Sequence, residues 1–129
     1  MSTLHAWLGV PVMILCLYAF GYALGGWLRE RAYQKKMWDL ASVFTLGLYL
    51  QIVTGFLVIF STTNRSFDRS LGLHMILSVV ATVLAQMTYT MNRRRPREER
   101  RYLTHVWGIG LALLMVIAGI VVIRVAALS

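Results

Sequence analysis

Four long stretches without Asp, Glu, Lys or Arg constrain this chain more than any other feature. They cover residues 6–28, 40–60, 71–91 and 102–123. An α-helix rises about 1.5 Å per residue, so about 20 apolar residues cross the roughly 30 Å hydrocarbon layer of a membrane. The sequence therefore predicts one all-α domain over residues 1–129, an integral-membrane four-helix bundle.

The composition agrees with a membrane domain and narrows the choice of partners. Hydrophobic residues make up 58% of the chain and charged residues only 14%, unlike a typical soluble domain. The net charge of +8 would suggest nucleic acid in a soluble protein, but here the charges flank apolar stretches and suit anionic lipid headgroups. We therefore expect membrane lipids, and no nucleic acid, as partners. Cys16 is the only cysteine, which excludes an intrachain disulfide.

Basic residues are concentrated in two of the three connections. Residues 29–39 hold four Lys or Arg and residues 92–101 hold six, ten of the thirteen in the chain. By the positive-inside rule both connections are cytoplasmic, so both termini lie on the outer side of the cell's inner membrane. Nothing before Ala6 is basic except His5, so we expect the first stretch to be a retained span, not a cleaved signal peptide.

Small and polar residues within the spans predict the faces that contact other helices. Gly21 and Gly25 form a GxxxG pair, which allows a close approach between helices. At 100° per residue, one arc of the second span carries four such residues: Gly47, Gln51, Thr54 and Gly55. We expect this arc to face protein and the rest of the span to face lipid.

His74 is the polar side chain that says most about function. Four small residues lie within about 40° of it on the same helix face: Ser78, Ala81, Ala85 and Thr88. Polar groups within spans turn toward the bundle interior or a cofactor, because hydrocarbon does not solvate them. The groove beside His74 admits either a neighbouring helix or a flat cofactor such as haem, and periodicity does not choose between them.

The other two histidines are candidate partners at opposite ends of the bundle. His5 precedes the first span and His74 lies one turn inside the third, so both lie toward the outer side and form a candidate axial pair for a haem iron. The alternative for His5 is a solvated residue near the terminus. His105 and Gln86 lie at similar depths near the cytoplasmic side, where an interhelical hydrogen bond would satisfy both. Ligation of a second cofactor by His105 is the alternative there.

The sequence excludes several classes of function. The spans hold no Asp or Glu for an ion path, and the chain has no phosphate-binding loop, nucleophile motif or HExxH motif. A quinone near His74 or His105 needs only one or two hydrogen-bond donors in an apolar pocket. We therefore expect an electron-transfer or accessory subunit, not a stand-alone enzyme or transporter.

Three segments carry a resemblance to the small four-helix transmembrane cytochromes b: LGLHMILSVVA around His74, RRYLTHVWGI around His105, and the final AGIVVI. The resemblance implies haem b held by paired histidines, with His74 matching an outer ligand, His5 its outer partner and His105 an inner ligand. The second span departs from the family pattern because it has no histidine, and Gln86 stands where a second histidine of the third span is expected. The layout is also similar to four-helix membrane proteins that assist cytochrome oxidase assembly.

Two functions follow as expectations. The first is a small subunit of a respiratory or photosynthetic electron-transfer complex, which binds haem b or contacts a quinone. The second is a cofactor-free structural or assembly subunit of a larger membrane complex. Both have other integral-membrane subunits as partners.

Overall fold

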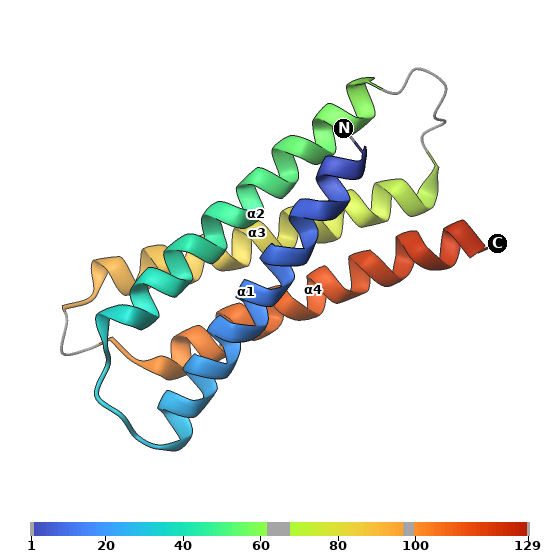
Figure 1. Ribbon diagram of the computed structural model, residues 1–129. Helices are drawn as coiled ribbons and strands as arrows, with labels where there is room; N and C mark the ends of the chain where they lie inside the picture. The colour runs from blue at the N-terminus through green and yellow to red at the C-terminus, as the bar shows by residue number, and fades with distance from the viewer. Residues whose placement is uncertain (1, 62–67, 97–99, 129) are drawn as a thin grey trace.

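The computed structural model of this protein describes residues 2–61, 68–96 and 100–128. Four α-helices make up nearly all of these residues: α1 (Ser2–Leu28), α2 (Lys35–Ser61), α3 (Arg69–Arg94) and α4 (Tyr102–Leu128). They form an elongated antiparallel bundle with both chain termini toward the same end (Figure 1). The predicted all-α, four-helix architecture is confirmed, and each helix is long and apolar enough to cross a membrane.

The helices extend beyond the uncharged stretches, which corrects the predicted boundaries. Helix α2 begins at Lys35, before the predicted start at Leu40, and α3 continues to Arg94. Helix α4 runs past Arg124 to Leu128. Hydropathy ends a span at its first charge, but backbone hydrogen bonding continues where long cationic side chains reach the membrane surface. The connections at the basic end are therefore shorter than predicted.

Local chemistry accounts for the ends of α1 and α3. The N–H of Arg31 donates to the Gly26 carbonyl and that of Glu30 to the Trp27 carbonyl, and Glu30 has φ 52°, in the left-handed region where glycine usually ends a helix. The Asp68 side chain accepts from the Leu71 N–H at the start of α3. At its end Arg95 is extended, as expected before a proline.

The order of packing places α1 diagonally opposite α3. Helices α1 and α2, α2 and α3, α3 and α4, and α4 and α1 are neighbours, with α3 and α4 in the closest contact, whereas the backbones of α1 and α3 do not approach each other. In Figure 1, α1 runs in front and α3 behind. A Cβ placed on Gly108 would overlap the Thr88 side chain, so glycine at that position permits the close approach of α4 to α3.

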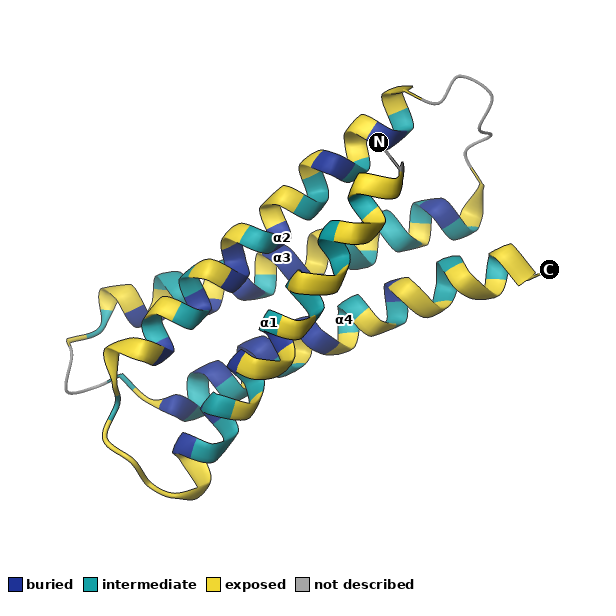
Figure 2. Cartoon of the chain, viewed as in Figure 1, coloured by how far each residue is buried: buried dark blue, intermediate teal, exposed yellow. Residues whose placement is uncertain are grey.

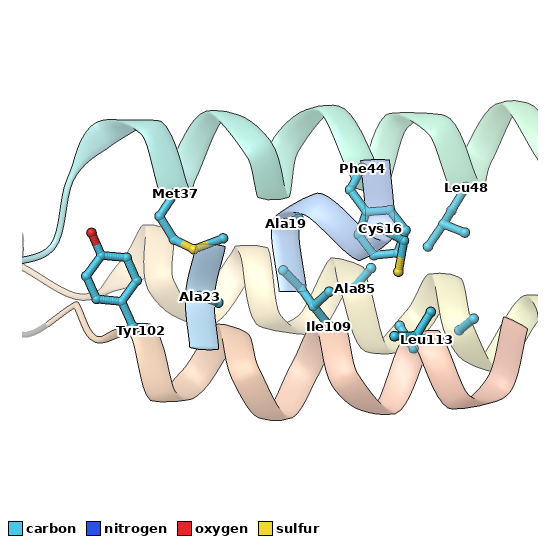
Figure 3. Close-up of a cluster of buried hydrophobic side chains, with 12 residues drawn as sticks. Cys16, Ala19, Ala23, Met37, Phe44, Leu48, Ala85, Tyr102, Ile109 and Leu113 are labelled. Atoms are coloured by element: carbon cyan, nitrogen blue, oxygen red, sulfur yellow. The ribbon is translucent and has the colours of Figure 1, made fainter. Parts of the chain in front are cut away.

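Small and medium-sized side chains fill the interior. Ala19 and Ala23 of α1, with Ala112 of α4, are completely buried, and Phe44 and Ile109 pack beside them (Figure 3). The outward faces are exposed along every helix (Figure 2) and carry large apolar side chains. A bundle with an apolar exterior has its outer surface matched to lipid.

The GxxxG pair of α1 does not pack within the bundle. Gly21 is exposed, and a Cβ placed there would meet nothing within 4 Å. The buried face of α1 instead presents Ala19, Ala23 and Gly26, and a Cβ on Gly26 would lie 2.7 Å from the Tyr102 ring. The alanine face of α1 therefore makes the contacts inside the bundle, and the predicted close approach at Gly21 stays a prediction about a helix outside this chain.

Candidate functional site

A cavity of about 80 Å³ lies inside the half of the bundle that is nearer to the termini. All four helices line it, with His5 from α1, Gln51 from α2, His74 from α3 and Val116 from α4 among the lining residues. Most of the remaining wall is apolar. The structure thus brings two of the three histidines to one interior space.

His5 and His74 face this space from helices whose backbones do not approach each other. Their ring centroids are 6.5 Å apart and their ring planes are nearly perpendicular, at 87°. Thr54 and Gly55 of the predicted arc of α2 lie beside the His5 ring, and the small-residue face of α3 that carries His74 is turned inward, with Ala81, Ala85 and Thr88 buried. Both predicted faces therefore take part in the packing around the two rings.

The hydrogen bonds of His5 define its tautomer. The Thr54 hydroxyl donates its proton to the Gln51 carbonyl, at 3.1 Å. The same Thr54 oxygen lies 2.9 Å from His5 Nδ1. While the hydroxyl bonds to the Gln51 carbonyl, its oxygen accepts from the Nδ1–H of His5, and the lone pair of the neutral ring is then on Nε2.

His74 has the same arrangement with a different acceptor. Its Nδ1 lies 2.9 Å from the Gly119 carbonyl oxygen, which can only accept. Nδ1 is again the protonated nitrogen and Nε2 the nitrogen with the lone pair. Within the described residues, no hydrogen bond reaches Nε2 of either histidine. Two imidazole nitrogens are thus held ready to bind an electrophile.

Gln51 orients the helix turn that carries His5. With its side-chain amide in the orientation that satisfies both atoms, the nitrogen donates to the His5 carbonyl at 3.2 Å and the oxygen accepts from the Gly9 N–H at 3.3 Å. A Cβ on Gly9 would lie 3.0 Å from the Gln51 amide atom that faces it, which is the oxygen in this orientation. Glycine at this position therefore gives the Gln51 amide room beside the backbone of α1.

Two further glycines give the imidazole rings their room. A Cβ on Gly55 would lie 3.2 Å from His5 Cε1, and a Cβ on Gly119 would lie 3.4 Å from His74 Nδ1. Both distances are tighter than ordinary packing or at its limit. Gly55 and Gly119 are therefore part of the site, because each allows a ring to lie against helix backbone.

His105 lies at the opposite end of the bundle from this cavity. It is completely buried, and its Nε2 is 2.6 Å from the hydroxyl of Tyr33, a residue of the connection between α1 and α2. The two rings also stack, with centroids 5.6 Å apart and an angle of 21°. Nδ1 of His105 has no hydrogen-bond partner among the described residues. His105 does not join the other two histidines.

The predicted hydrogen bond between Gln86 and His105 is absent. The Gln86 amide oxygen accepts from the Tyr49 hydroxyl at 2.8 Å, and its nitrogen donates to the Thr90 hydroxyl at 3.0 Å. Gln86 lies about 120° around α3 from His74, toward α2, whereas His74 bonds to α4. The predicted pair does not form, because Gln86 turns toward α2 and lies nearer the middle of the bundle than His105.

Tyr33 is a site residue that the sequence analysis missed. It belongs to a short polar connection, where no periodicity signals which side chain turns inward. Burial raises the pKa of Tyr33 to about 12, partly opposed by the nearby positive charge of Arg100. Its hydroxyl is therefore protonated at neutral pH and can donate to His105. The only available signal was an aromatic residue amid charged ones.

Comparisons of the chain with protein-family models, with curated proteins and with solved structures find no match.

Proposed function

We propose that this protein is a small electron-transfer subunit of a respiratory or photosynthetic membrane complex, in which His5 and His74 supply the axial ligands of one haem b. The observation that carries the proposal is the pair of imidazole rings that line one cavity with centroids 6.5 Å apart, each with its Nδ1 already in a hydrogen bond. When bound, haem b supplies one-electron redox chemistry.

The donor set fits this group. Histidines that ligate a metal usually donate their other ring N–H to an oxygen, which fixes the ring and strengthens the ligand. Thr54 and the Gly119 carbonyl provide those oxygens. The cavity of about 80 Å³ is smaller than the roughly 300–1,000 Å³ of typical cofactor pockets, so lining side chains must move to admit a macrocycle. Met13, an unbranched side chain in the wall, can adapt in this way.

The remaining residues would hold and shield the group. Gln51 fixes the turn of α1 that bears His5, and Gly55 and Gly119 let the rings lie against backbone. Apolar wall residues such as Phe44 and Val116 exclude water and lower the local dielectric constant. These features favour a buried redox centre over a hydrolytic site.

The charge distribution supports an orientation with the histidine pair on the outer half of the inner membrane. The two connections rich in Lys and Arg lie at the end opposite the His5–His74 cavity, and the positive-inside rule assigns that end to the cytoplasm. A reporter active only outside the cytoplasm, fused to the C-terminus, is expected to be active. A silent reporter alongside a cytoplasmic reporter that is active at the same position would reverse the orientation.

A reduced-minus-oxidised absorption spectrum of the purified protein tests the haem. We expect Soret and α bands in the natural protein and their loss in His5→Ala and His74→Ala. His105→Ala is the matched control, because His105 lies outside the cavity, and it should keep the bands. Circular dichroism verifies that each variant is folded. A well-folded natural protein without bands, after expression with a haem precursor, would refute the proposal.

One observation favours the second candidate, a cofactor-free structural or assembly subunit. Gly21 lies on the exposed face of α1 with open space beside it, where a helix of another subunit could approach closely. Gly21→Leu should then abolish co-purification with the partner complex and leave the spectrum of the isolated protein unchanged. Equal co-purification of Gly21→Leu and the natural protein would remove this support.

A further inference from the structure

A second hollow, of about 240 Å³, opens on the outer surface between α2 and α3. We call it the α2–α3 groove. Its lining residues are Tyr49, Ile52, Val79, Thr82, Val83, Gln86 and Met87. Most of these side chains are apolar, as expected for a surface that faces lipid. The groove lies outside the histidine cavity and its polar residues have no part in the ligation proposed above.

Two polar side chains in the groove are unusual for their position. Tyr49 lies near the middle of α2, and 43% of its surface is exposed to the bundle exterior. Its hydroxyl donates to the Gln86 amide oxygen at 2.8 Å, so a phenol and a carboxamide meet near the centre of the membrane. Polar groups at that depth are costly when they face lipid, and they commonly mark a binding site. Together they offer donors and an acceptor to a bound molecule.

The groove and the histidine cavity share a wall. Ile52 of α2 and Thr82 of α3 line both the exterior groove and the cavity that contains His5 and His74, so these side chains form part of a common wall. A molecule in the groove would therefore lie beside the redox centre proposed above, and it could arrive from the lipid without crossing the core.

We propose that the α2–α3 groove binds the headgroup of a membrane quinone. The choice of quinone rests on the proposed electron-transfer function, because a redox partner dissolved in lipid explains why a polar pair lies in a groove that shares a wall with the cavity. A cavity of about 150 Å³ holds benzene, so the groove of about 240 Å³ admits a substituted six-membered ring. The ring would lie against Val79 and Val83, and a quinone carbonyl would accept from the Gln86 N–H that does not bond to Thr90, while Tyr49 holds the amide in place. The open side lets the isoprenoid tail remain in lipid.

Equilibrium binding of decylubiquinone to the full chain in phosphatidylcholine nanodiscs tests this proposal. Val83→Trp fills the groove from an exposed position, so the fold should tolerate it, and we expect Kd to rise at least ten-fold. Val121→Trp makes the same change on the exposed face of α4 and should leave Kd unchanged.

The polar pair has its own variants. Tyr49→Phe combined with Gln86→Leu should also raise Kd at least ten-fold, whereas Tyr18→Phe, on the exposed face of α1, should not. A photoreactive azido-quinone should label residues of the groove, such as Met87. Binding that is absent in the natural protein, or equal in all variants, would overturn the proposal. The proposal would also be overturned if Val83→Trp abolished co-purification with another membrane subunit and left the Kd for quinone unchanged. The groove would then be a protein interface.

The haem spectrum of each sample separates this proposal from the previous one. Quinone binding that is sensitive to Val83→Trp in a protein without haem bands would refute haem ligation and leave the groove assigned. Haem bands that depend on His74, with no quinone binding, would refute the groove and leave the ligation intact.

Discussion

Tyr33→Phe is the perturbation for which the structure gives the clearest expected magnitude. The substitution removes one hydroxyl and keeps the ring that stacks on His105. His105 Nε2 then loses its 2.6 Å hydrogen bond at a completely buried position, where water does not reach it. A buried polar atom left without a partner costs about 1–3 kcal/mol. We expect the free energy of unfolding to fall by that amount.

A double-mutant cycle with His105→Leu measures the coupling energy between Tyr33 and His105. In His105→Leu the Tyr33 hydroxyl loses its partner, but Tyr33 is only partly buried, so water can replace the histidine nitrogen. Adding Tyr33→Phe to His105→Leu should therefore cost much less than the same change costs in the natural protein, because replacing both partners by apolar groups is nearly neutral. The difference between the two costs is the coupling energy.

Reversible unfolding in mixed detergent micelles, followed by circular dichroism, measures all four corners of the cycle. Tyr89→Phe is the matched control, because no hydrogen bond of its hydroxyl occurs within the described part of the chain, and it should lie within about 0.5 kcal/mol of the natural protein. A Tyr33→Phe variant as stable as the Tyr89→Phe control would show that the hydrogen bond from Tyr33 to His105 does not stabilise the fold. Equal effects of Tyr33→Phe in both backgrounds would show that the two residues are not coupled.

Four further predictions follow from individual contacts. Glu30→Gly should stabilise the protein by about 1 kcal/mol in the same unfolding assay, since glycine adopts the left-handed conformation at the end of α1 without strain; a loss of stability would contradict this. Asp68→Ala should cost about 1 kcal/mol by removing the N-cap of α3, whereas Asp68→Ser should retain most of it. Gly26→Ala should lower the thermal midpoint, at a cost of about 1–3 kcal/mol, because its Cβ would lie 2.7 Å from the Tyr102 ring; an unchanged midpoint would mean that the ring moves freely. Burial raises the pKa of Tyr33 to about 12, against about 10 in an unfolded chain, so the unfolded state loses the proton first as pH rises. The free energy of unfolding should therefore fall between about pH 10 and about pH 12, and Tyr33→Phe should abolish this fall.

The spans and the inward side of α3 were predictable from sequence because their determinants are periodic. Each apolar stretch is long enough to cross a membrane, and the small residues recurring from Ser78 to Thr88 mark the face that packs. The exact helix ends were not predictable from charge, because Lys35 and Arg94 continue helices whose side chains reach the membrane surface. Hydropathy reports burial in lipid, whereas helix ends depend on capping.

Contacts between helices were less predictable, because they depend on rotation and not on depth alone. Gln86 lies nearer the middle of the bundle than His105 and turns toward α2, so it bonds to Tyr49. The Gly119 carbonyl that holds His74 left no sequence signal as an acceptor, since every residue has a carbonyl group. Tyr33 reaches His105 from a connection without periodicity. These residues required the three-dimensional arrangement of the helices.

The diagonal placement of α1 and α3 has a consequence for how the chain assembles. His5 belongs to the hairpin of α1 and α2, and His74 to the closely packed hairpin of α3 and α4. Hairpins insert into membranes as units and then associate. Any ligand that bridges the two rings joins two insertion units, so its binding energy adds directly to their association. Two separately expressed hairpins, 1–61 and 68–129, would then assemble more tightly with the ligand than without it. The ligand-bound histidine pair would thus stabilise the association of the two halves of the protein.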